Sequence, residues 1–443
     1  MTAVRIAEQL AAAGLDPAAV AGRSRLFETV FSGFAALAAR KPAYAWWVPG
    51  RLEVFGTHTD YAGGRTLVAA LPRGFAVAAA RRSDTQLHVL DAVNREQVVL
   101  DPRSQPLSGW RRYVQVVVQR LDCNFPGALR GADLAFASDL PRAAGMSSSS
   151  ALIVGVATAL VKLWDLHRHE RWRTNIGTLE DLATFLASVE SGRSFAGLEG
   201  DQGVGTHGGS EDHAAMLLAS PQRVTAFSFL PLRRLKDAVV PDAWRFVVAS
   251  SGVPSEKTGT AREPYNRLSQ ATADLLRLWN IHRGPATSLA AALESEPRAS
   301  ARLHDLIGSA LAQPDREALQ RRLQHFSAED GLVMPALHAF DTRDAESLAD
   351  LSELSQQNAE QLLRNQIPET IALVRSARRQ GALAARAFGA GFGGSAWALV
   401  EEGRAQEFSG RWLAEYHRVC PHATAATAFV AAPGPPLTEV ICR

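Results

Sequence analysis

The sequence has few cysteines and no long hydrophobic run. Only three of its 443 residues are cysteine, too few and too scattered for a disulfide framework or a cysteine-based metal cluster. No apolar stretch approaches the roughly 20 residues that a membrane-spanning helix needs. Glu8 and Asp16 interrupt the short apolar runs near the N-terminus, which argues against a secretory signal. We therefore expect a soluble, cytoplasmic protein with no membrane partner.

Lysine is also scarce, because it occupies only four positions and almost all basic residues are arginine. No lysine lies in a Gly-x-x-x-x-Gly-Lys-Ser/Thr pattern, which excludes a P-loop. The 47 basic residues are balanced by 45 acidic ones, giving a net charge of +2. This balance gives no support for a nucleic-acid partner.

The length and a hydrophobic content of 47% favour two domains, which we expect at residues 1–220 and 221–443, where the composition shifts. Hydrophobic periodicity predicts helical stretches at 3–40, 110–121, 143–191 (with a polar break near 167–178), 265–282, 285–325 and 346–379. Short strands are expected at 44–48, 52–55, 67–71, 75–81, 87–90, 97–100, 132–136, 245–249, 385–388, 396–400 and 425–431. Strands mixed with helices in both halves indicate an α/β or α+β protein.

Three segments rich in small residues stand far apart in the chain: 49–61 (PGRLEVFGTHTDY), 141–150 (PRAAGMSSSS) and 389–394 (GAGFGG). An apolar, helix-prone stretch at 152–163 follows the second segment, so its serines stand at the start of a predicted helix. Free backbone N–H groups and the helix dipole make such a start an anion site. Each segment alone is typical of an ordinary turn or, for the serine run, of a flexible linker.

In this order the three segments resemble the motifs of the GHMP kinase superfamily, with the closest likeness to its galactokinase branch. The first galactokinase motif, Gly-Arg-x-Asn-x-x-Gly-Glu-His-x-Asp-Tyr, matches the frame from Gly50 to Tyr61, and the likeness extends from Phe31 to Val400. It implies a two-domain fold, with a ribosomal-protein-S5-like α/β N-terminal domain and a ferredoxin-like α+β C-terminal domain. It also implies ATP and Mg²⁺ as cofactors, an active site between the domains, and a monomer or weak homodimer.

The resemblance assigns ATP binding to the second and third segments, and Mg²⁺ binding to serine hydroxyls with one carboxylate, since Mg²⁺ prefers oxygen ligands. Glu190 matches the metal glutamate of the family by its order in the chain, although it is equally compatible with an exposed helical charge. The metal ligands are then Ser148, Ser149 and Glu190, and the ATP-binding residues are Pro141, Ala143, Ala144, Gly145, Met146, Ser147, Ser148, Ser149, Ser150, Gly391 and Gly393.

The resemblance also implies a catalytic aspartate at a helix start, with Arg51 beside it. Asp212 fits this role, because it lies in a Gly-x-x-Asp frame that begins at Gly209 and precedes an apolar stretch. Asp201 is the alternative, because it reproduces the Asp-Gln pair of the family. The glycines that follow Asp201 make a poor helix start, which favours Asp212.

The sugar-binding residues implied by the resemblance are Thr57, His58, Asp60, Gly209 and Tyr265. His58 and Tyr265 are also compatible with purely structural roles. Thr57 replaces the glutamate of the family motif and Glu53 replaces its asparagine, which leaves the sugar open.

The expected activity is ATP-dependent phosphorylation of a monosaccharide, at the anomeric hydroxyl of galactose or a related sugar. The alternatives are a kinase for arabinose, fucose, a heptose or an N-acetylhexosamine, and a non-catalytic sensor that binds ATP and sugar.

Overall fold

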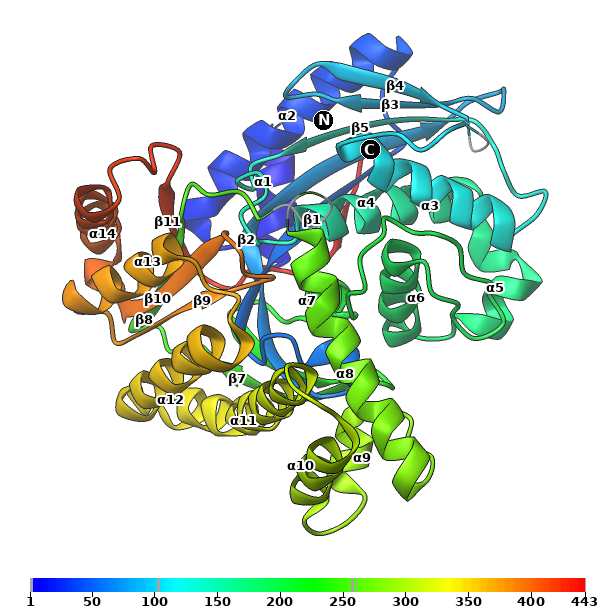
Figure 1. Cartoon of the computed structure of the whole chain (residues 1–443). Helices are drawn as coiled ribbons and strands as arrows, with labels where there is room; N and C mark the ends of the chain where they lie inside the picture. Colours follow the sequence, from blue (N-terminus) through cyan, green and yellow to red (C-terminus); the bar gives the residue numbers. More distant parts are fainter. Residues whose placement is uncertain (1–2, 102–103, 256–258, 260, 443) are drawn as a thin grey trace.

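The computed structural model describes residues 3–101, 104–255, 259 and 261–442 (Figure 1). Its helices are α1 (Ala3–Ala12), α2 (Pro17–Ala38), α3 (Trp110–Asn124), α4 (Ser148–Leu163), α5 (Glu170–Asn175), α6 (Leu179–Ser191), α7 (Glu211–Leu218), α8 (Arg262–Arg283), α9 (Leu289–Glu294), α10 (Ala299–Ala310), α11 (Asp315–Thr342), α12 (Ala345–Gln357), α13 (Pro368–Arg379) and α14 (Ala405–Val419). Its strands are β1 (Tyr44–Phe55), β2 (Arg65–Arg81), β3 (Leu87–Asp91), β4 (Glu96–Leu100), β5 (Ala132–Ser138), β6 (Arg223–Ser228), β7 (Arg233–Val239), β8 (Trp244–Ser250), β9 (Ala384–Phe388), β10 (Ser395–Glu401), β11 (Thr427–Ala431) and β12 (Thr438–Val440).

The strands of the described chain form one eight-stranded and one four-stranded sheet. The larger sheet has the order β12-β1-β2-β5-β3-β4, and β6 and β7 continue it from the first part of β2. The sequence predicts two short strands in place of each of β1 and β2, but both are continuous, with a register shift between Pro49 and Arg51. Gly74 makes this pairing possible, because a Cβ there would lie 2.1 Å from the carbonyl oxygen of Val48.

Helices cover both faces of the larger sheet, and alternate strand residues reach each layer. On one face, Ala45 and Trp47 of β1 pack with α1 and α2. On the other, Trp46 and Val48 join a large core with α3, α4 and α6. The N-terminal helical prediction is therefore confirmed, with a break before Pro17.

The smaller sheet is antiparallel, with the order β11-β8-β10-β9. One face packs on α13 and α14, and its other face, through Phe246 and Trp397, joins the core of the larger sheet. The indole nitrogen of Trp397 donates a hydrogen bond to the carbonyl oxygen of Glu53 in β1, 3.1 Å away. The two sheets are thus joined directly at the first segment, residues 49–61.

The larger sheet continues beyond residue 220, the expected end of the first domain. β6 and β7 both extend it, and β12 returns from the C-terminal end of the chain to pair with β1. The sequence did not predict these three strands. We propose that the boundary lies near residue 240 and that the last strand belongs with the first unit.

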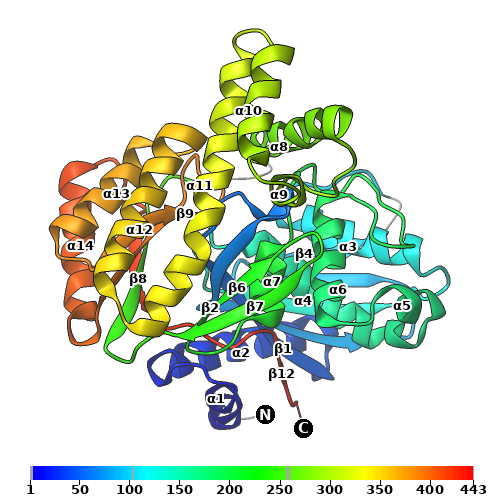
Figure 2. The same ribbon diagram turned by 90° about the horizontal axis from the view of Figure 1, so that it is seen from below.

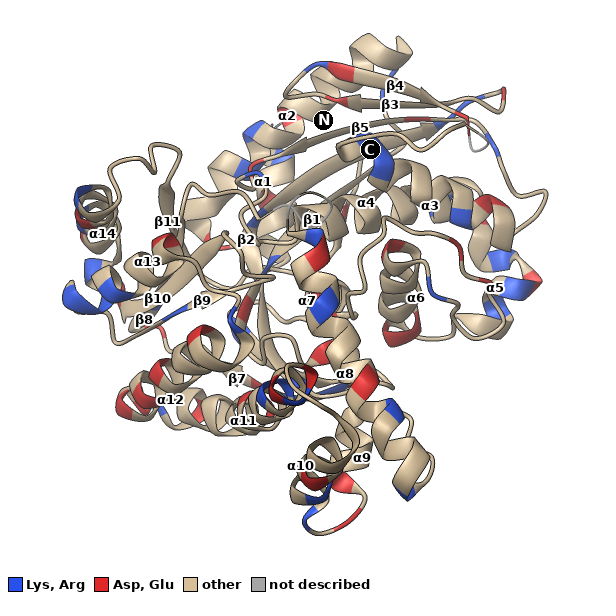
Figure 3. Cartoon of the chain, in the orientation of Figure 1, with Lys and Arg blue, Asp and Glu red and all other residues tan. Residues whose placement is uncertain are grey.

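Helices α8, α9, α10 and the first part of α11 form a lobe that projects from the two sheets (Figure 2). Tyr61, the last residue of the first segment, and the next residue, Ala62, belong to the apolar core of this lobe. Charged residues of both signs are scattered over the outer helices (Figure 3). Within the described ranges, no helix is both long and apolar enough to cross a lipid bilayer.

Candidate active site

The three separated segments meet where the two sheets adjoin. A Cβ on Gly389 would lie 2.9 Å from the carbonyl oxygen of Gly145, so these two backbones touch. The Ser395 hydroxyl donates to the carbonyl oxygen of Ala144 at 2.6 Å. The backbone N–H of Arg51, in the first segment, donates to the carbonyl oxygen of Met146 at 3.2 Å. One continuous surface therefore contains parts of all three segments.

The serine run forms the N-terminus of α4, as the sequence predicts. Ser147 precedes the helix in the left-handed conformation, with φ of 60°, and Gly145 has φ of 74°. The Ser147 hydroxyl is buried and has no hydrogen-bond partner among the described residues. A helix N-terminus with an unused buried hydroxyl and glycine backbones on two sides fits a phosphate group, whose oxygens accept hydrogen bonds from such donors.

The third segment supports this cradle through backbone contacts. Gly391 packs so closely on Asn365 that a Cβ would lie 2.4 Å from its side chain, and its carbonyl oxygen accepts a 2.6 Å hydrogen bond from the Ser255 hydroxyl. Gly393 lies against the backbone of Val253, 2.8 Å from the position of a Cβ. The backbone N–H of Ser255 donates to the carbonyl oxygen of Ala143 at 2.7 Å. These contacts fix the third segment against the second.

Glu190 is buried at the end of α6 rather than an exposed helical charge. Its two carboxylate oxygens accept hydrogen bonds from the hydroxyls of Ser149, at 3.2 Å, and Ser150, at 2.8 Å. Ser148 is the preceding residue of the same helical turn. Three or more His, Cys, Asp or Glu side chains do not gather into a metal cluster anywhere in the described ranges. Glu190 and the serine hydroxyls nonetheless suit Mg²⁺, which is commonly bound by one or two carboxylates together with phosphate and water oxygens.

Asp212 forms a buried ion pair with Arg51. Its Oδ1 atom lies 2.7 Å from both Nε and a terminal nitrogen of the guanidinium, and its Oδ2 atom accepts a 3.2 Å hydrogen bond from Ser150. Burial opposes the charge of Arg51, but Asp212, Glu211 and Glu53 outweigh burial and raise the pKa of Arg51 above its ordinary value. The first turn of α7 also favours a carboxylate at this position.

Asp201, the alternative aspartate, lies elsewhere. The residue is at the surface, its carboxylate accepts a 2.8 Å hydrogen bond from the backbone N–H of Gly203, and it lies 3.8 Å from Arg120. It does not line the pocket that contains Asp212.

A pocket opens between Asp212, the first segment and the third segment. Gly209 lies so close to Asp60 that a Cβ would be 2.2 Å from the Asp60 carboxylate, so any larger residue would displace one of them. Of the residues that the sequence predicts for sugar binding, metal binding or catalysis, the pocket wall includes Arg51, His58, Asp60, Glu190, Gly209, Asp212 and Tyr265.

His58 is held from both sides of its ring. One ring nitrogen lies 3.0 Å from the carbonyl oxygen of Ala390, to which it donates, and the other lies 2.8 Å from the hydroxyl of Tyr61. Arg322, from α11, donates to the carbonyl oxygen of His58 at 2.6 Å and to the Tyr61 hydroxyl at 3.0 Å. Tyr265 packs on the same ring, with the ring centroids 5.2 Å apart. His58 therefore joins the first segment, the third segment and the helical lobe.

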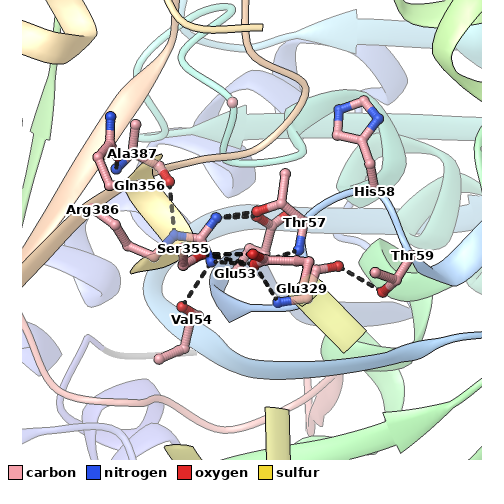
Figure 4. A network of polar contacts seen from close by, with 12 residues as sticks. Glu53, Val54, Thr57, His58, Thr59, Glu329, Ser355, Gln356, Arg386 and Ala387 are labelled. Atoms are coloured by element: carbon pink, nitrogen blue, oxygen red, sulfur yellow. Dashed lines mark hydrogen bonds and ion pairs between the residues drawn. The ribbon is translucent and has the colours of Figure 1, made fainter. Parts of the chain in front are cut away.

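Thr57 is the one predicted sugar-binding residue that the structure places outside the pocket wall. It is buried beneath the wall, where its hydroxyl contacts Glu53 and Arg386 (Figure 4). Arg386 also pairs with Glu329 at 3.1 Å, and Glu329 accepts from the backbone N–H of Thr57 at 3.3 Å. The Thr57 hydroxyl is therefore engaged by buried charged side chains beneath the pocket.

Glu53 and Glu211 line the pocket, and sequence reasoning did not assign them to it. Glu53 stands at the asparagine position of the first motif, and Glu211 directly precedes Asp212. The signal that could have found them is their position, because Glu53 lies within the first motif and Glu211 lies beside the candidate catalytic aspartate. The sequence alone does not show that both side chains turn inward.

Comparisons with known proteins match the same regions of the chain. A family model described as the galactokinase galactose-binding signature matches residues 32–81, which contain the first segment. The model described as the GHMP kinases N terminal domain matches residues 112–209, and the GHMP kinases C terminal model matches 335–418. Together these matches cover just over half of the chain and include all three segments.

Curated relatives and solved structures are similar to this chain over most of its length. A galactokinase of Roseiflexus sp. is 28% identical over 375 residues, covering 83% of this chain and 86% of the relative. A galactokinase of Actinobacillus pleuropneumoniae serotype 5b is 25% identical over 367 residues, covering 81% and 86% respectively. The structure of Lactococcus lactis galactokinase complexed with galactose aligns with a TM-score of 0.77 at 22% identity, over 93% of this chain and 99% of that one. A Methanococcus jannaschii mevalonate kinase aligns with a TM-score of 0.52 at 14% identity, covering 88% and 98%. The predicted two-domain fold is therefore confirmed.

Proposed function

The chain belongs to the galactokinase family of the GHMP kinase superfamily, and we propose that it phosphorylates a monosaccharide with ATP, at the anomeric hydroxyl of galactose or a related sugar. The single observation that carries the proposal is the buried Asp212–Arg51 pair beside Ser150, Glu190 and the N-terminus of α4. This arrangement supports phosphoryl transfer, because a carboxylate suited to the acceptor hydroxyl lies next to a helix N-terminus suited to phosphate. Phosphoryl transfer depends on this alignment more than on covalent chemistry by the protein.

Asp212 is our candidate catalytic residue. Arg51 binds its Oδ1 atom, while Oδ2 lies 3.2 Å from the Ser150 hydroxyl, whose single proton it shares with Glu190, so the carboxylate is held in one orientation at the pocket wall. A carboxylate held in this way can accept the proton of a sugar hydroxyl and direct that oxygen toward the cradle. Because transfer passes through a loose transition state, orientation precedes most of the proton movement.

The second and third segments would bind ATP, the phosphoryl donor, and so form the donor side of the cleft. ATP supplies the phosphoryl group, and Mg²⁺ supplies charge neutralisation. Ser147 and the first-turn N–H groups of α4 are suited to bind phosphate oxygens, and Ser148, Ser149 and Glu190 to hold the metal.

The composition of the pocket wall supports an uncharged sugar as the acceptor. Glu53, Asp60, Glu190, Glu211 and Asp212 all line it, whereas Arg51 is already paired with Asp212. Carboxyl groups suit the hydroxyls of a polyol, while an additional anion would be repelled. We therefore propose a neutral hexose or pentose rather than a uronic acid or a sugar phosphate.

The test is a coupled ADP-release assay over a panel that contains galactose, arabinose, fucose, a heptose, N-acetylgalactosamine and galacturonic acid. We expect turnover on at least one neutral sugar and none on galacturonic acid. If ATP and a sugar bind but no sugar is turned over, the protein is a non-catalytic sensor and the kinase proposal is wrong. We also propose a cytoplasmic location and a monomer or weak homodimer, and sedimentation velocity measures the oligomeric state.

A further inference from the structure

Glu211 occupies an unusual position for an acidic side chain. It is the first residue of α7, only 5% exposed, and it lines the acceptor pocket beside Asp212. Its backbone N–H donates a 3.1 Å hydrogen bond to the Asp60 carboxylate, which fixes the start of the helix. The side chain is thus rigidly placed on the pocket wall.

The hydrogen bonding of the Glu211 carboxyl is incomplete. Its Oε1 atom lies 3.0 Å from Nε of Arg51, but that nitrogen donates to Asp212 at 2.7 Å. No described residue gives Oε1 a hydrogen bond. A buried carboxylate that shares its one cation with Asp212 and receives no hydrogen bond on Oε1 is incompletely compensated for the water it has lost.

Most of the charges around Glu211 also oppose a second negative charge, although the N-terminus of α7 favours one. Glu53 and Arg51 face it from β1, Asp60 from the end of the first segment, and Asp212 from α7 itself. Burial, then Glu53, and further Asp60 and Asp212, raise the pKa of Glu211 well above its ordinary value, although Arg51 acts in the opposite direction. Glu190, His58 and Tyr265 complete the polar wall of the same pocket.

We propose that Glu211 is an acceptor-binding residue that keeps its proton and donates a hydrogen bond from its carboxyl to an oxygen of the sugar. Asp212, held ionised by Arg51, accepts a hydrogen bond instead. Two neighbouring acidic residues then perform opposite tasks, because their environments separate their protonation states. This inference rests on the proposed function, since it assigns a contact to the sugar of that reaction.

Glutamine tests the idea directly, because its amide has nearly the shape of a protonated glutamate and also donates a hydrogen bond. At neutral pH we expect E211A to raise the KM for the sugar about tenfold, the size of one lost neutral hydrogen bond, with the KM for ATP unchanged. E211Q should recover most of that loss. As pH rises, the wild-type KM should increase when Glu211 ionises, and E211Q should not show this increase.

The matched control is E170Q, because Glu170 is also the first residue of a helix, α5, but is exposed and outside the pocket. It removes the same charge from a helix start, and every kinetic constant should stay at the wild-type value. Thermal melting and ATP binding of each variant show whether it is folded.

Two results would overturn the assignment. If E211Q is as impaired as E211A, the ionised form is the functional one. If E211A binds sugar as well as the wild type, Glu211 does not contact the sugar. Failure of the kinase proposal is distinguishable, because the wild type itself would then show no turnover on any sugar of the panel.

Discussion

The donor and acceptor sides of the cleft are built from different parts of the chain. The donor side consists mostly of backbone, from residues 141–150 and 389–395, where Gly145 and Gly389 touch. The acceptor side consists mostly of buried side chains, and ionisable groups such as Arg51, Asp60 and Glu211 come from separate elements. Backbone groups have the same charge wherever they lie, whereas the charge of a carboxyl depends on its burial and neighbours. The donor side therefore depends on the local backbone of two segments that folding brings together, and the acceptor side depends on side-chain charges that the folded environment sets.

The largest effect is expected from a variant that changes the acceptor side alone. Replacing Asp212 by asparagine keeps the shape but removes the charge that orients the hydroxyl, so kcat should fall by about 10²- to 10⁴-fold. ATP binding, measured by calorimetry, should persist, because the cradle is unchanged.

The control for this variant is D201N, in which an exposed aspartate outside the pocket is changed in the same way. It should turn over sugar at the wild-type rate. Inactivation by D201N together with an active D212N would reverse the choice of the catalytic aspartate.

Two glycine substitutions should separate the sides of the cleft by their kinetic signatures. G209A places a Cβ 2.2 Å from the Asp60 carboxylate and should raise the KM for sugar at least about tenfold. G393A places one 2.8 Å from the Val253 carbonyl oxygen, at a φ of 130° and outside the acceptor pocket, and should raise the KM for ATP by a similar factor.

Gly410 gives the control, because it lies in α14 with open space where its Cβ would be. G410A should leave both KM values unchanged and increase stability by about 0.5–1 kcal/mol. Equal effects of G209A and G393A on both substrates would show that the two sides do not act separately.

The smallest expected effect concerns the support behind the acceptor side. His325 is fully buried and accepts a 3.0 Å hydrogen bond from Arg322, which also holds His58. Burial, then the charge of Arg322, lowers the pKa of His325 well below its ordinary value. In the unfolded chain the imidazole gains a proton near pH 6.5, but in the fold it stays neutral. Stability is therefore lost as pH falls below about 6.5, by at most about 1.4 kcal/mol per pH unit.

Denaturant titrations at pH 7.5 and pH 5.5 measure this loss, and H325Q should show less of it than the wild type. The exposed His422 offers a control, because H422Q should keep the full wild-type dependence on pH. An identical pH dependence in wild type and H325Q would show that His325 is not the group responsible.

The sequence predicted much of the secondary structure, because most helices and strands follow local periodicity. It missed β6, β7, β12, the helix α14 and the second half of α11, and it divided β1 and β2 at Pro49 and near Gly74. The strand errors have one cause, since strand pairing over long distances decides whether a short apolar run becomes a strand and whether a proline interrupts it. The serine-rich start of α4 was recognisable because its residues are contiguous.

The sequence by itself determined the family, the order of the three segments and the residue types that can bind phosphate. Only the tertiary structure decided that Asp212 lies in the pocket while Asp201 does not, that Thr57 lies under Arg386, and that Glu53 and Glu211 face inward. The physical reason is that each part of the backbone cradle is formed by residues that are neighbours in sequence, although the two parts meet only in the folded chain. A buried charge acquires its direction, partner and protonation state from elements that folding brings together.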